Sequence, residues 1–169
     1  MITVITGNGK GKTTSALGGA MSAAMAGRRV YVGQFMKAGD YSEIAMLKSA
    51  FPEIVIEQFD GGMLINRAAK DNDRAAAQDG AARAMAAMAS GKYDLIVLDE
   101  LNVVLFLELI DMGQAMKLMD DAKKSGTDLI LTGRYAAPEV LQRADAAYEL
   151  LQIKHYFNDG VPARKGIEM

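Results

Sequence analysis

The sequence contains no cysteine, a single histidine and only three prolines among its 169 residues. Without cysteine there is no thiol nucleophile, disulfide framework or cysteine-based zinc site. A lone histidine, His155, likewise excludes a histidine-rich metal site. The prolines at 52, 138 and 162 are scattered and mark no linker. We therefore expect one domain of ordinary size over residues 1–169.

An excess of positive charge is also missing. Lysine and arginine number 19 against 21 acidic residues, a net charge of −2, which argues against non-specific binding to nucleic acid or acidic membranes. No apolar run approaches the roughly 18 residues that span a bilayer, and residues 1–5 lack the charged start of a signal peptide. The expectation is a soluble, cytoplasmic protein.

Short runs rich in β-branched residues alternate with alanine- and methionine-rich stretches of helical spacing. The expected strands are 2–6, 30–34, 54–58, 95–98, 129–132 and, more weakly, 147–153. The clearest expected helices are 12–26, 68–89 and 112–125, the last with Asp111 as N-cap and Gly126 just past its end. This alternation predicts an α/β fold with a mostly parallel sheet and helices on both faces. Ligands of such sheets bind beyond the carboxyl ends of the strands.

A glycine-rich segment joins the first expected strand to the first helix. It reads Gly7-Asn8-Gly9-Lys10-Gly11-Lys12-Thr13-Thr14. Glycines let backbone N–H groups point inward, the helix start attracts anions, a lysine adds a mobile charge, and a threonine hydroxyl can bind Mg²⁺. The pattern G-x-x-x-x-G-K-[ST] is nearly met, with Thr6 at its first glycine position. The segment predicts a shortened triphosphate-binding loop; a plain glycine-rich turn is the alternative.

The fourth expected strand ends in two acids, Asp99 and Glu100. In P-loop proteins such a strand places a carboxylate near Mg²⁺, and we expect it to lie beside the first strand. Adjacent strand residues point to opposite faces unless the strand has ended. One acid would then hold the metal or its water while the other fixes the loop. The alternative is a helix start with Asp99 as N-cap.

Three further candidates follow other strand ends or lie near the C-terminus. Lys37 is placed to meet an anionic ligand or to be a solvated lysine, and Arg134 to neutralise phosphate charge or to form a surface ion pair. His155 lies among aromatic residues and is either structural or part of the site. Residues 61–66, which include Met63 and Leu64, offer an apolar edge suited to a lid.

In this order along the chain, these segments resemble the P-loop type of ATP:corrinoid adenosyltransferase. The resemblance rests on 6–14, 32–37, 95–101, 131–134, 144–145, 149–150, 153–155, 160–161 and 166–168, which are spread over nearly the whole chain. It implies a single P-loop NTPase-like (RecA-like) domain. It also implies a reaction in which Co(I) of a reduced corrinoid attacks the 5′-carbon of ATP and triphosphate leaves.

The resemblance implies roles for the candidate residues. The loop from Gly7 to Thr14 and Lys12 would hold the triphosphate, and Arg134, with Lys10 and Lys37, would offset its charge. Mg²⁺ or Mn²⁺ would be held by Thr13 and Glu100, assisted by Asp99.

The resemblance implies two further contacts, and the sequence departs from the family in two places. His155 would contact the nucleotide, and Met63 and Leu64 would face the corrinoid, where relatives often carry aromatic residues. Many relatives also have an N-terminal extension over the site, whereas the first expected strand here starts at Ile2.

The resemblance further implies an outside electron donor of the flavoprotein type and a possible homodimer. Two other functions remain open at this stage. One is a P-loop phosphotransferase or ATPase that releases ADP; the other is a non-catalytic nucleotide-binding partner in corrinoid handling.

Overall fold

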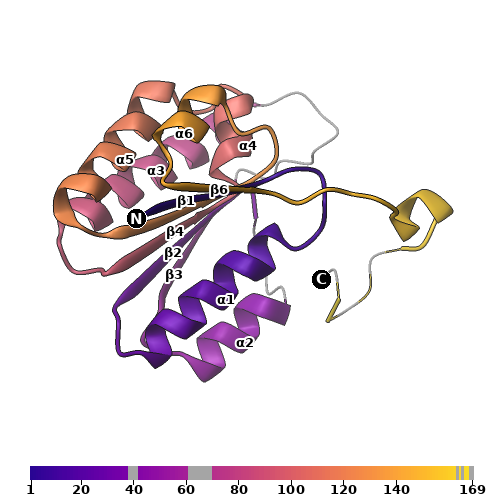
Figure 1. Ribbon diagram of the computed structural model, residues 1–169, viewed down its shortest axis with the longest axis horizontal. Coiled ribbons are helices and arrows are strands. Elements are labelled where there is room, and N and C mark those ends of the chain that lie inside the picture. Colours follow the sequence, from indigo (N-terminus) through magenta and orange to yellow (C-terminus); the bar gives the residue numbers. More distant parts are fainter. Residues whose placement is uncertain (38–41, 61–69, 163, 165, 168–169) are drawn as a thin grey trace.

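A parallel β-sheet forms the centre of the protein (Figure 1). The computed structural model describes residues 1–37, 42–60, 70–162, 164, 166 and 167. The six strands lie in the order β3-β2-β4-β5-β1-β6 and every neighbouring pair is parallel. Their bounds are β1 Ile2–Thr6, β2 Val30–Phe35, β3 Val55–Phe59, β4 Leu95–Asp99, β5 Asp128–Thr132 and β6 Ala146–Glu149. The predicted α/β fold with a parallel sheet is confirmed.

Helices cover both faces of the sheet, as predicted (Figure 1). On one face lie α1 (Lys12–Met25) and α2 (Ser42–Ala50); on the other lie α3 (Asp71–Ala89), α4 (Leu101–Phe106), α5 (Met112–Ser125) and α6 (Pro138–Arg143). Helices α2, α4 and α6 were not predicted, because they span nine residues or fewer and show too little periodicity.

Alternating strand residues supply the two cores between these layers. Val30 and Val32 of β2 pack toward α1 and α2, whereas Tyr31 and Phe35 pack toward α3. This alternation is the period of a strand that is buried on both faces.

The ends of two elements show how well local signals place a boundary. Helix α5 starts and stops where predicted, because Asp111 accepts from the N–H of Gln114 and Gly126 adopts a left-handed φ of 75°. Strand β6 ends earlier than the predicted 147–153. Its neighbour β1 turns after Thr6 into the glycine-rich segment 7–14, named the phosphate loop for its predicted role, so the residues beyond 150 lose their pairing partner. The chain then runs away from the sheet toward a short 3₁₀ helix, Tyr156–Asp159 (Figure 1).

The expectation that the acidic strand lies beside the first strand is wrong. Strand β5 is inserted between β1 and β4, and pairs with both. The end of β5, at Thr132, therefore lies between the end of β1, which leads into the phosphate loop, and the acidic end of β4. Sequence spacing does not encode the strand order. The order depends on where each crossover connection places the next strand in the sheet.

Helix α3 approaches the sheet closely at Gly80. A Cβ atom at this position would lie 2.6 Å from ring carbons of both Phe35 and Phe59. These two rings pack at a centroid distance of 5.4 Å. Gly18, in α1, differs, because a Cβ there would meet nothing within 4 Å.

We expect Gly80→Ala to destabilise the protein and Gly18→Ala to stabilise it. Overpacking against the two rings should lower the free energy of unfolding by about 1–3 kcal/mol. Alanine at the open helical position should instead raise it by about 0.5–1 kcal/mol. Chemical denaturation of both variants measures this difference, and equal effects would contradict the close approach of α3.

Candidate active site

The phosphate loop is held in place by the segment that follows β6. The N–H of Gly9 donates to the carbonyl of Leu150 at 2.7 Å. A Cβ at Gly7 would lie 2.5 Å from the same carbonyl oxygen, and one at Gly9 would lie 2.7 Å from it. Gly7 also has a φ of 95°. Glycine is thus required here by close approach as well as by backbone conformation.

Helix α1 begins without the usual polar cap. Its N-cap is Gly11, in a left-handed conformation at φ 111°, with no side-chain cap hydrogen bond and no acidic residue in the first turn. The first N–H groups of a helix lack partners within the helix, and their partial positive charge favours an anion. The start of α1 is therefore suited to bind an anion.

Lys12 is buried, although it lies at the start of α1. Only 7% of the residue is exposed, and its Nζ donates to the carbonyls of Gly7 and Gly9 at 2.8 and 2.7 Å. Burial lowers the pKa of this ammonium group below its usual value. Its hydrogen-bond partners are neutral carbonyls, so an anion in the loop would stabilise its charge.

Asp99 joins the acidic strand to the loop. Its carboxylate is fully buried and accepts from Thr13 Oγ1 at 3.0 Å, Thr132 Oγ1 at 2.6 Å and Gln34 Nε2 at 2.9 Å. It also accepts from Lys37 Nζ at 2.8 Å. These donors come from α1, from β2 and β5, and from the residues just after β2, so Asp99 fixes the loop threonine relative to the sheet.

Glu100 faces the cleft, unlike its neighbour. Strand β4 ends at Asp99, and Glu100 turns to a left-handed φ of 62° as the N-cap of α4 without a side-chain cap hydrogen bond. This turn lets Glu100 line the same cleft as Lys12 and Thr13. Burial, and then the nearby charge of Asp99, raise the pKa of the Glu100 carboxyl above its usual value. The pair therefore divides into a fully buried acid, Asp99, and a partly buried acid, Glu100, that lines the cleft.

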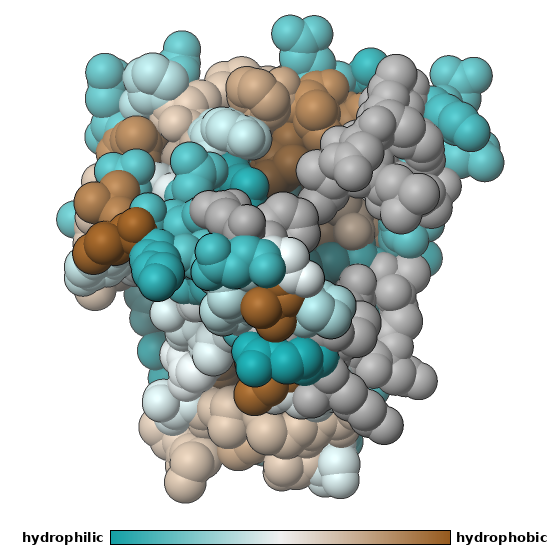
Figure 2. Space-filling model, turned by 90° about the vertical axis from the view of Figure 1, so that its right-hand side faces the viewer, coloured by the Kyte–Doolittle hydropathy of each residue, from teal (hydrophilic) through white to brown (hydrophobic). Residues whose placement is uncertain are grey.

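A cleft of about 610 Å³ opens at the carboxyl ends of the strands. Figure 2 looks onto this side of the molecule, where hydrophilic and hydrophobic side chains lie side by side. Many of the predicted site residues line the cleft, namely Asn8, Gly9, Lys10, Gly11, Lys12, Thr13, Thr14, Lys37, Glu100, Arg134 and His155. Gly7 instead packs against the backbone of Leu150. Met63 and Leu64 lie outside the described residues.

The other wall of the cleft is apolar and was missed by sequence reasoning. This wall is lined by Val103 and Phe106 of α4, by Leu107 just past its end, and by Tyr135. The rings of Phe106 and Tyr135 pack at a centroid distance of 4.4 Å, although the residues are 56% and 53% exposed. No local signal marks α4 as a cleft wall, because the helix is short and its position depends on the turn at Glu100.

Three neighbouring strands are each followed, within three residues, by a non-glycine residue with a left-handed backbone. Met36 follows β2, Glu100 follows β4 and Tyr135 lies just beyond β5, with φ values of 56°, 62° and 61°. All three line the cleft. Such backbone strain is concentrated at functional sites, which supports this cleft as the site.

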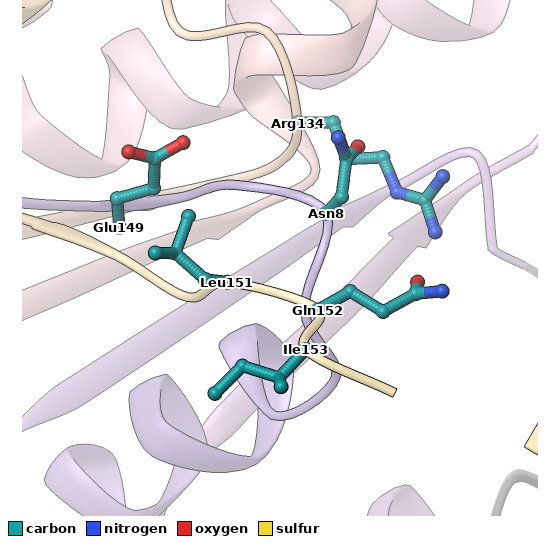
Figure 3. A pocket seen from close by; sticks show the side chains of 6 residues that line it. All are labelled: Asn8, Arg134, Glu149, Leu151, Gln152 and Ile153. Carbon is teal, nitrogen blue, oxygen red and sulfur yellow. The ribbon is translucent and has the colours of Figure 1, made fainter. Parts of the chain in front are cut away.

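A second hollow of about 540 Å³ lies on the other side of Asn8 and Arg134, which line both spaces. Figure 3 shows the amide of Gln152 extending in the direction of the Arg134 guanidinium. Leu151 and Ile153, which are 70% and 98% exposed, also line this second hollow. Asn8 and Arg134 can therefore be reached from two sides.

The donor set fits a magnesium ion. Mg²⁺ prefers hard oxygen ligands and usually takes only one or two carboxylates together with phosphate oxygens and water. The hydroxyl of Thr13 and the carboxylate of Glu100 line one cleft, and Asp99 holds Thr13 from behind. The three predicted residues are thus brought together: Thr13 and Glu100 line the cleft, and Asp99 is buried next to Thr13.

Over residues 1–169 the chain matches the family described as ATP:corrinoid adenosyltransferase BtuR/CobO/CobP. The chain belongs to this family. The resemblance noted in the sequence is confirmed.

Named relatives agree with this membership. A corrinoid adenosyltransferase of Escherichia coli (strain K12) is 31% identical over 169 residues, covering 99% of this chain and 85% of the relative. One of Pseudomonas aeruginosa is 33% identical over 170 residues, covering 99% and 83%. An uncharacterized protein of Nostoc is 35% identical over 180 residues; this chain spans only 47% of its length.

Among the described residues, no helix has both the length and the apolar character needed to cross a membrane.

We expect Glu100→Gln to raise the stability of the ligand-free protein at neutral pH. Because the folded-state pKa of Glu100 is raised, its ionised form costs stability above that pKa, and the cost disappears as pH falls below the ordinary glutamate range. Each kcal/mol gained would raise the melting temperature by about 2–4 °C. Melting curves from pH 8 to pH 4 should converge with those of the parent, while the exposed Glu53→Gln serves as control. A variant less stable than the parent at pH 8 would show that Glu100 is not held in this environment.

Proposed function

We propose that this chain transfers the 5′-deoxyadenosyl group of ATP to Co(I) of a corrinoid and releases triphosphate. The observation that carries the proposal is one cleft with a glycine-rich loop and lysine side chains on one side and an exposed apolar, aromatic wall on the other. A kinase or ATPase needs the first feature, whereas a second substrate with a broad apolar face needs the second. Family membership supports the same conclusion.

The triphosphate is the leaving group, so the protein's first task is to hold it. Backbone N–H groups from Gly7 to Thr14 and the ammonium of Lys12 would surround it, at the uncapped start of α1. Lys10, Lys37 and Arg134 would offset the charge that develops on its oxygens. All three side chains line the cleft.

The bond changes need no general base. The electron pair of Co(I) forms the cobalt–carbon bond, and the bond between the 5′-carbon and oxygen breaks, its electron pair leaving on the triphosphate. Cobalt becomes formally Co(III), and no proton is transferred. The chain contributes orientation, charge stabilisation and exclusion of water.

A bound Mg²⁺ or Mn²⁺ would neutralise part of the triphosphate charge. Thr13 and Glu100 are the residues that would hold it, with Asp99 fixing the threonine hydroxyl. His155 would contact the nucleotide from the C-terminal segment, as it lines the cleft.

The corrin ring would lie against the apolar wall. Phe106 and Tyr135 present more than half of their surface to solvent, and a ligand with a broad apolar face would bury it. Met63 and Leu64 are proposed to face the same substrate, which stays a prediction because they lie outside the described residues.

The family resemblance supports three finer proposals. Reduction of Co(II) to Co(I) needs one electron from outside this chain, and a flavoprotein is the proposed donor. A homodimer and a cytoplasmic location are proposed on the same basis.

The deciding experiment is an anaerobic incubation with MgATP and a chemically reduced corrinoid. Stoichiometric triphosphate and a light-sensitive organocobalt spectrum are expected. ADP would instead indicate a phosphotransferase or ATPase. Nucleotide binding without turnover would indicate a non-catalytic protein.

We expect Lys12→Met to lower the rate of adenosyl transfer by about a hundredfold or more, because one preorganised charge on the leaving group is lost. Since Lys12 is buried, thermal unfolding must first show that the variant remains folded. Transfer at near the parental rate in a folded variant would remove this lysine from the mechanism.

Phe106→Ala should weaken corrinoid binding and leave ATP binding unchanged. Removing the exposed ring should cost about 1–2 kcal/mol, a five- to thirtyfold rise in the apparent KM for the corrinoid. Met25→Ala is the matched control, since Met25 is 80% exposed at the end of α1. A rise confined to the KM for ATP would place the nucleotide, not the corrin, on this wall.

A further inference from the structure

Lys37 lies where a metal ion would meet the protein. Its Nζ is 2.8 Å from Thr13 Oγ1 and 2.8 Å from Asp99 Oδ2. These oxygens belong to two of the three residues that fit Mg²⁺ in this cleft. The Lys37 side chain is 20% exposed while that of Asp99 is fully buried, so the ammonium group is the member of the pair nearer to solvent.

The carboxylate of Asp99 has no acceptor capacity to spare. Two oxygens offer about four acceptor sites, and four side chains donate to them, from Thr13, Gln34, Lys37 and Thr132. Gln34 and Thr132 are fully buried. The other two donors, Thr13 and Lys37, line the cleft, and of these only Lys37 carries a positive charge that would repel an arriving cation.

The charge of Lys37 has a clear function in the ligand-free protein. A buried carboxylate without a counter-charge is strongly disfavoured, and Lys37 is its ion-pair partner among the described residues. Lys37 itself is held firmly: burial alone would lower the pKa of its ammonium group, but the charge and the hydrogen bond of Asp99 more than offset this and raise it.

We propose that Lys37 is a resident cation that occupies the metal position of the nucleotide-free protein, so that the metal enters only together with a triphosphate. The inference rests on the nucleotide and metal parts of the proposed function, not on the corrinoid. Phosphate oxygens in the loop would give Lys37 a second anionic partner, and its long flexible side chain lets it leave Asp99 for them. The counter-charge at Asp99 is then supplied by the metal.

The test measures Mn²⁺ binding to the intact chain, by the loss of the free-ion signal in electron paramagnetic resonance. Without nucleotide, Lys37→Met should bind Mn²⁺ at least about tenfold more tightly than the parent, because repulsion between a single and a double charge a few ångströms apart is removed. Lys37→Arg, which keeps the charge, should stay weak. Lys117→Met, on the surface of α5, is the control. With inorganic tripolyphosphate present, the advantage of Lys37→Met should shrink or reverse.

Equal Mn²⁺ affinity of the parent and Lys37→Met without tripolyphosphate would overturn the proposal, as would tightening in Lys117→Met. A second measurement needs no variant. Mg²⁺ alone should leave the melting temperature of the parent protein unchanged, and Mg²⁺ with tripolyphosphate should raise it beyond tripolyphosphate alone. Stabilisation by Mg²⁺ alone of the same size would also overturn it. No corrinoid is used, so failure here is distinct from failure of adenosyl transfer.

Discussion

The buried carboxylate of Asp99 is the interaction on which the carboxyl edge of the sheet depends. It lies at the end of the central strand β4 and draws donors from β2, β5, α1 and Lys37. Each donor would be costly to leave unpaired at this depth. The network therefore fixes where the loop threonine stands relative to the sheet, and with it the distance between the phosphate cradle and the cleft-facing acid Glu100.

The two lysines near this acid pair differ in the partners that they have. Lys37 contacts a carboxylate, and its pKa is raised; Lys12 contacts two backbone carbonyls, and its pKa is lowered. Lys37 thus has a carboxylate in direct contact, whereas the charge of Lys12 is offset through space by Glu100 and Asp99 and would gain a closer partner in an anion bound at the loop. The same electrostatic rule raises the pKa of one lysine and lowers that of the other in the ligand-free protein, although both side chains line the cleft.

Strain at the strand ends shapes the rest of the cleft. The left-handed residues Met36, Glu100 and Tyr135 each cost about 1–3 kcal/mol, and they persist because the packed sheet and helices around them fix the backbone path. Their effect is to turn the chain sharply as three adjacent strands end. Glu100 comes to face the loop, and Tyr135 comes to lie against Phe106. A site with a charged side and an aromatic side follows from these turns.

The sequence by itself determined the parallel α/β fold, the phosphate loop, the acid pair and family membership, because each depends on local spacing: buried runs of period two, glycines before a helix start, acids at a strand end. It also placed both ends of α5 through its caps. Only the tertiary structure decided that β5 separates β1 from β4, that Lys12 is buried, and that Lys37 pairs with Asp99. It also assigned Asp99 to the interior and Glu100 to the cleft, and formed the wall of Phe106 and Tyr135. These features join residues distant in sequence, and their contacts arise from crossover order and packing, which no local pattern records.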